Sequence, residues 1–180
     1  MKTITSGTIH VFTFKDGILA RLAHDLRLTL MDFEVHVDDR MVRAVFFPAS
    51  LKVDGTMRKG KLDTTELSTS DHQKIHKHIV EDVLHTSKYP EIRFEGEATE
   101  EKDDRFFIDG QLEMHGRFAP IKLNVTHKLR RYRGFIPLQP SKWGIAPFKA
   151  LGGAIKLQDR VEVTFDLPDL SNLPDDELEE

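Results

Sequence analysis

Short runs in which apolar and polar residues alternate are the feature that most constrains the fold of this chain. In the run 121–129, one face carries Ile121, Leu123, Val125 and Leu129, and the other carries lysine, asparagine and threonine. Successive side chains of a β-strand point to opposite faces, so a period of two predicts a strand with one buried face. The same alternation recurs at 26–30, 33–37, 92–94, 106–114 and 161–165. This pattern is typical of antiparallel sheets, because buried parallel strands are apolar on both faces.

Turn-forming residues separate these runs, and their spacing indicates a single domain. Glycine, proline and clustered charged residues mark turns at 15–17, 37–40, 100–104, 114–120 and 130–134. Regularly spaced short strands are typical of a β-barrel or a β-sandwich. The chain has 180 residues, within the ~100–200 residues of a common single domain. We expect one domain over residues 1–168 and an acidic, frayed tail over 169–180.

One segment has a helical period instead. Ile75, Ile79 and Val83 repeat every four residues, which predicts one helix over about 71–85. Either Ser70 or Asp71 can cap its first turn. A proline at position 90 then begins the next strand. The sequence therefore predicts a single helix inserted between strands.

Histidines on this helix raise the question of a metal site. His72 and His76 are four residues apart, and such a pair on one helical face can supply two ligands to zinc or copper. However, the residues between them are Gln73, Lys74 and Ile75 rather than the glutamate of the His-Glu-x-x-His arrangement. Two neighbouring lysines also disfavour a cation. Helix packing or surface exposure is the favoured interpretation, and metal binding stays as the alternative.

Composition excludes several classes of protein. The net charge of −4 argues against non-specific binding of nucleic acid, and the absence of cysteine excludes disulfides and thiolate metal sites. No run approaches the ~18 apolar residues of a membrane-spanning helix. The first residues alternate at once and contain no apolar core of a signal peptide. We therefore expect a soluble, cytoplasmic protein.

Two further histidines and the single tryptophan are candidates for a site inside the fold. His127 has the parity of Leu123 and Val125, and His24 has the parity of the leucines at 26–30, so both are expected on the apolar side of a strand. Each is either a hydrogen-bonded structural histidine or a polar contact for the head group of an apolar ligand. His24 and Asp25 are adjacent on a strand and point to opposite faces, so a catalytic pair is not expected. Trp143 lies in a long loop and either plugs a barrel end or lines its mouth.

Four segments, in order and spacing, resemble the YceI-like family of lipocalin-like proteins, which includes polyisoprenoid-binding proteins. They are "LARLAHDLRLTL", "VLHTSKYPEIRFEG", "IDGQLEMHGRFAPIKLNV" and "KWGIAPFKALGGAIKLQDRVEV". The resemblance runs from about residue 7 to about residue 167. It implies an extended, eight-stranded antiparallel β-barrel with one covering helix and an elongated apolar cavity. It also implies a long isoprenoid- or quinone-like ligand, no catalytic residues, no metal or cofactor, and a tendency to form homodimers. Many members carry a signal peptide, which the start of this sequence does not show.

The function expected from these observations is that of a non-catalytic carrier holding a long apolar ligand inside the barrel. Two alternatives remain: a histidine-based metal-binding protein or enzyme, and a filled barrel that binds a protein partner. An eight-stranded barrel is about the size that holds one small ligand. The large apolar residues either line a tunnel or fill it. The candidate ligand-binding residues are Phe12, His24, Leu26, Leu28, Phe33, Phe94, Phe106, Ile108, Leu123, Val125, His127, Trp143 and Phe165.

Overall fold

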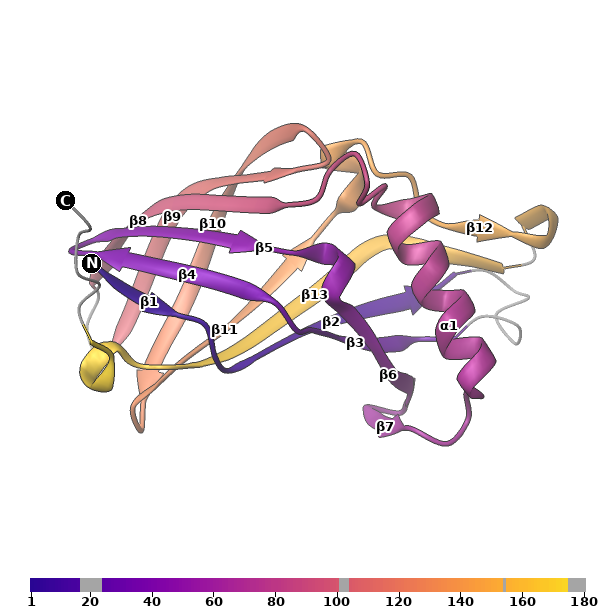
Figure 1. Cartoon of the computed structure of the whole chain (residues 1–180), viewed down its shortest axis with the longest axis horizontal. Coiled ribbons are helices and arrows are strands. Elements are labelled where there is room, and N and C mark those ends of the chain that lie inside the picture. The colour runs from indigo at the N-terminus through magenta and orange to yellow at the C-terminus, as the bar shows by residue number, and fades with distance from the viewer. Residues whose placement is uncertain (17–23, 101–103, 154, 175–180) are drawn as a thin grey trace.

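The computed structural model describes residues 1–16, 24–100, 104–153 and 155–174, and it is mainly antiparallel β-sheet with one α-helix. This confirms the predicted fold class. The strands form an elongated body, with α1 near one end and β1 near the other (Figure 1). The elements are β1 (Lys2–Ile4), β2 (Thr8–Lys15), β3 (Leu26–Leu30), β4 (Phe33–Asp38), β5 (Met41–Phe46), β6 (Leu51–Arg58), β7 (Lys61–Asp63), α1 (Thr69–Lys77), β8 (Ile92–Glu100), β9 (Arg105–Met114), β10 (Arg117–Lys128), β11 (Arg131–Leu138), β12 (Lys149–Ala150) and β13 (Ile155–Pro168). Short 3-10 helices cover Pro48–Ser50, Pro140–Trp143, Leu151–Gly153 and Leu170–Asn172.

The sheet has more strands than the eight expected because three long strands are interrupted. The order of neighbours is β1-β4-β5-β8-β9-β10-β11-β13-β2-β3-β6-β7, with β12 pairing only β13. Only two to four residues separate β1 from β2, β3 from β4 and β5 from β6. Counting each of these pairs as one bent strand, together with β8, β9, β10, β11 and β13, gives the eight long strands of the prediction.

Hydrogen bonds do not close the sheet into a complete barrel, which corrects one part of the expectation. The bent strand of β1 and β2 pairs with both β4 and β13, but β6 pairs with β3 and β7 and not with β8, so the sheet is open beside β6. The helix α1 packs beside β6 at this opening (Figure 1). A helix can cover an unpaired strand edge in place of another strand.

The covering helix begins earlier than predicted and changes its geometry part-way. Ser68, rather than Ser70 or Asp71, is the N-cap residue, and Asp71 completes a capping box with it. The α-helix ends at Lys77, and residues His78–Val83 continue as a π-helix. Ile75, Ile79 and Val83 pack against the core, which confirms the apolar stripe.

The two helix histidines bond to backbone carbonyls of β6 and of the 3-10 helix that precedes it. The Nδ1 of His72 lies 2.9 Å from the carbonyl oxygen of Val53 in β6, and the Nε2 of His76 lies 3.2 Å from that of Ala49. A buried backbone carbonyl without a partner is costly, so His72 replaces a hydrogen bond of a missing strand at the buried Val53. His76 instead bonds to the exposed residue Ala49 of the 3-10 helix Pro48–Ser50. This favours the packing interpretation of His72 and His76. Among the described residues, no three His, Cys, Asp or Glu side chains are grouped closely enough to hold a metal ion.

The last described residues pack on the domain instead of fraying. Asp169 is buried and caps the 3-10 helix Leu170–Asn172 through its carboxylate, which accepts from the Ser171 backbone N–H at 3.2 Å. Leu170 and Leu173 pack against the core. The folded part therefore extends past residue 168, because these two leucines cover the end of the barrel near β1. Residues 175–180 of the expected tail lie outside the described residues. Within the described part, no helix is long and apolar enough to cross a membrane.

Candidate ligand-binding cavity

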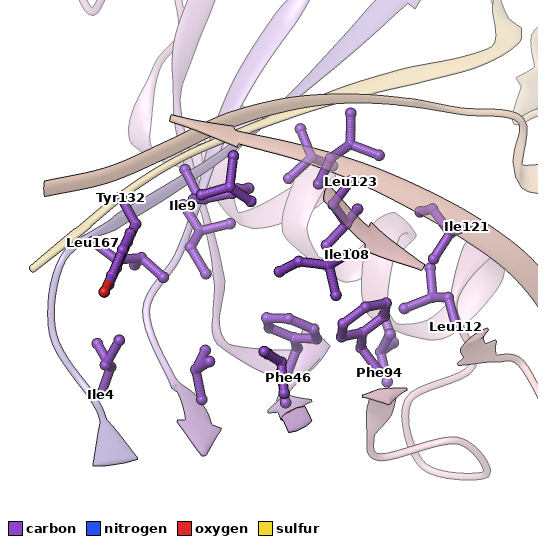
Figure 2. Close-up of a pocket in the computed structure, with 18 of the residues that line it drawn as sticks. Ile4, Ile9, Phe46, Phe94, Ile108, Leu112, Ile121, Leu123, Tyr132 and Leu167 are labelled. Atoms are coloured by element: carbon purple, nitrogen blue, oxygen red, sulfur yellow. The ribbon is translucent and has the colours of Figure 1, made fainter. Parts of the chain in front are cut away.

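An apolar cavity of about 330 Å³ lies between the inner faces of the strands. This volume is at the low end of the ~300–1,000 Å³ typical of small-molecule sites. The side chains come from most of the long strands, because each strand turns alternate residues inward. Ten of the lining residues are labelled in Figure 2: Ile4, Ile9, Phe46, Phe94, Ile108, Leu112, Ile121, Leu123, Tyr132 and Leu167.

Six of the candidate residues line this cavity: Phe94, Phe106, Ile108, Leu123, Val125 and Phe165. The structure therefore contains an open cavity where the sequence left a choice between a tunnel and a filled barrel. Gly134 leaves room for the ring of Phe165, since a Cβ atom at position 134 would lie 2.3 Å from that ring. The role of these six residues in ligand binding stays a prediction, with which their position in the lining is compatible.

Four apolar candidates lie elsewhere. Leu26, Leu28 and Phe33 are buried in the core but do not line the cavity. Phe12 lies on the opposite face of β2, because its neighbour Val11 lines the cavity and adjacent residues alternate. The ring of Phe12 instead meets that of His10 edge-on, with the ring centres 6.2 Å apart.

His24 does not face the apolar interior. Strand β3 begins only at Leu26, and the His24 side chain remains 36% exposed with its Nδ1 3.9 Å from a carboxylate oxygen of Glu66. Hydrogen bonds from Arg58 and then from the Thr56 hydroxyl lower the pKa of Glu66 to about 2. His24 therefore belongs to a polar cluster of Glu66, Arg58 and Thr56, away from the cavity.

Trp143 is buried in the core and does not line the cavity, which favours the plugging interpretation over lining the mouth. Its side chain is 2% exposed, and its indole N–H donates to the carbonyl oxygen of Leu112 at 2.8 Å. A buried indole needs such a partner, and the fixed geometry makes it part of the wall behind Leu112.

His127 has the same parity as Leu123 and Val125, but it does not line the cavity. Its Nε2 is 3.2 Å from the Oδ2 of Asp169, and its ring lies against that of Tyr132 with the centres 4.8 Å apart. Tyr132, and not His127, lines the cavity.

Sequence reasoning missed Tyr132, although a signal for it was present. Tyr132, Ile136 and Leu138 alternate along β11 and all line the cavity. The alternation is hidden because arginines flank Tyr132 and because Gly134 and Pro137 interrupt the run. Residues of the interrupted strands, such as Ile4, Ile9 and Phe46, were missed for a similar reason.

Comparison with known proteins agrees with this architecture. The family model described as YceI-like domain matches residues 12–168. The chain belongs to the YceI-like family.

Two solved structures of this family's fold are similar over most of their length. BcnA of Burkholderia cenocepacia has 13% sequence identity and a TM-score of 0.62, covering 89% of this chain and 94% of that chain. A polyisoprenoid binding domain from Saccharophagus degradans, described as implicated in plant cell wall breakdown, has 9% identity and a TM-score of 0.61, covering 93% and 97%. At such identities the likeness shows a shared fold.

A curated relative is similar over a shorter stretch. UPF0312 protein plu2095 of Photorhabdus laumondii is 31% identical over 77 residues, which are 43% of this chain and 38% of the relative. The match therefore spans less than half of either protein.

Proposed function

We propose that this YceI-like protein binds and carries one long apolar molecule, isoprenoid- or quinone-like, in the cavity between its strands. The observation that carries the proposal is the nature of the lining, where Tyr132 and Asp39 are the only described residues with an oxygen atom in the side chain. Burial of hydrocarbon contributes ~0.8 kcal/mol per methylene, so a chain of a few isoprene units can be held without any charged contact. The polyisoprenoid binding domain of similar fold supports the same ligand class.

The proposed function is binding and transport, without a catalytic step. Catalysis needs a nucleophile, an acid or a base placed beside the bound molecule. Among the described residues, the cavity lining contains no serine, threonine, histidine, lysine or arginine, and its ionisable side chains are the exposed Asp39 and Tyr132. This supports a carrier rather than an enzyme.

Native mass spectrometry of the untagged protein, followed by organic extraction, tests the proposal. We expect a bound apolar molecule of defined mass that is released on extraction. A protein mass without any ligand, together with failure to take up added apolar chains, would refute the carrier function.

The cytoplasmic location and the homodimer stay predictions. Fractionation of cells that express the natural gene, and light scattering of the purified protein during gel filtration, check them.

A further inference from the structure

The cavity has one polar end. Among the described lining residues, Asp39 and Tyr132 are the two with side-chain oxygens. Asp39 lies in the turn between β4 and β5, which is at the end of the molecule away from α1 (Figure 1). Tyr132 lies near the start of β11, where it pairs with Leu167 close to the C-terminal 3-10 helix. Asp39 is also exposed, so the cavity reaches the surface near the turn between β4 and β5. Figure 2 shows the Tyr132 hydroxyl as the oxygen among the drawn side chains, directed into the space between Ile4 and Leu167.

Contacts from several elements fix the position of this hydroxyl. The Tyr132 ring lies against His127 of β10 at 4.8 Å between centres and meets Phe106 of β9 edge-on at 6.3 Å. His127 is held in turn by Asp169, which caps the C-terminal 3-10 helix. Leu170, the next residue, lines the cavity. A donor held in this way loses little side-chain entropy when a ligand binds.

The chemistry of this end favours an uncharged partner. Burial first, and then the charge of Asp169, raise the pKa of the Tyr132 phenol, and a hydrogen bond that its oxygen accepts from the Leu170 backbone opposes them. The phenol stays protonated, and its O–H remains free to donate one hydrogen bond. An oxygen of the ligand inside an apolar cavity needs such a donor. An anionic head group would need a cation, yet no lysine, arginine or histidine is found among the described lining residues, and Asp39 would repel it.

We propose that the ligand is an apolar chain ending in an uncharged alcohol or carbonyl oxygen, and that the Tyr132 hydroxyl donates a hydrogen bond to this oxygen. The inference rests on the carrier function proposed above and narrows its ligand class. Asp39 at the opening selects against phosphate and carboxylate head groups.

Three probes with one saturated branched chain test the inference: phytane without a head group, phytanol, and phytanyl monophosphate. Each is titrated into lipid-free protein against a displaceable fluorescent probe, N-phenyl-1-naphthylamine. We expect phytanol to bind more tightly than phytanyl monophosphate. Tyr132→Phe should weaken phytanol about 3- to 10-fold, the effect of one lost hydrogen bond, and leave phytane unchanged.

The chain offers a matched control, because it has two tyrosines. Tyr89 lies against His115, with the ring centres 4.3 Å apart, and does not line the cavity. Tyr89→Phe should leave all three affinities unchanged. Both variants keep the ring, and unchanged melting temperatures show that the fold is retained.

The outcomes separate the two proposals. If Tyr132→Phe leaves phytanol binding unchanged, or weakens phytane equally, or if the phosphate binds as tightly as the alcohol, the head-group inference is wrong and the carrier function stands. If none of the three probes binds, the carrier function is refuted and the inference falls with it.

Discussion

Filling the cavity from its wall is the most direct perturbation of the proposed site. Leu123 points from β10 into a cavity of about 330 Å³, so Leu123→Trp places an indole where the ligand would lie. If the indole displaces one isoprene unit of about five carbons, the lost burial is ~4 kcal/mol at ~0.8 kcal/mol per carbon. Since each 1.4 kcal/mol changes affinity tenfold, apolar chains should bind about 10³-fold more weakly.

The neighbouring residue supplies the control. Lys122 is adjacent on β10, points outward and lies 3.2 Å from Asp109 in an exposed ion pair. Lys122→Trp should therefore leave binding unchanged. Fluorescence displacement with phytanol measures affinity, and urea unfolding of the ligand-free variants measures stability. Overpacking a filled core costs ~1–3 kcal/mol, so a near-normal stability of Leu123→Trp supports an empty cavity. Full affinity in a folded Leu123→Trp variant would show that the ligand binds elsewhere.

Three further predictions concern the frame around the cavity. Replacing both His72 and His76 with alanine removes one hydrogen bond to β6 and one to the 3-10 helix before it; we expect a loss of ~1–3 kcal/mol in urea unfolding, and an unchanged stability would show that the two bonds do not hold the helix. Thr56 is 1% exposed and donates to Glu66; Thr56→Val should cost ~1 kcal/mol, whereas a gain in stability would contradict this account. Burial first, and then nearby His85 and Lys88, lower the pKa of His115 below its ordinary 6.5. The unfolded chain therefore binds this proton more readily, so the stability contributed above pH 6.5 is lost as the pH falls through 6.5 toward the folded value. Thermal unfolding between pH 7.5 and about pH 5 should show a smaller decline in a His115→Gln variant, and an equal decline would assign it to other groups.

The sequence was most informative where local periodicity and burial agree. Along β10, Leu123 and Val125 alternate with polar residues, and both line the cavity as their parity predicted. The stripe of Ile75, Ile79 and Val83 likewise predicted the packed face of the helix. These features follow from backbone geometry within one element, so no distant part of the chain is needed to infer them.

Local patterns failed where a bend or a partner far along the chain decides the outcome. The break between β1 and β2 lets one segment pair with both β4 and β13. The residues near this break do not indicate which strands it pairs with. Phe12 was misplaced because it was grouped with other bulky residues, although its alternation with Val11 puts it on the other face of β2. The helix begins two residues before its predicted start at residue 71, because Ser68 and Asp71 form the capping box.

By itself, the sequence determined the class of the fold, the inward face of each regular strand, the single helix and the family. Only the tertiary structure decided that the barrel is left open beside β6, that Trp143 is buried and bonded to Leu112, and that Tyr132 and Asp39 line the cavity. The physical reason is the range of the interactions. Alternation and capping act within a few residues, whereas an empty volume and its polar end depend on side chains from strands at both ends of the chain.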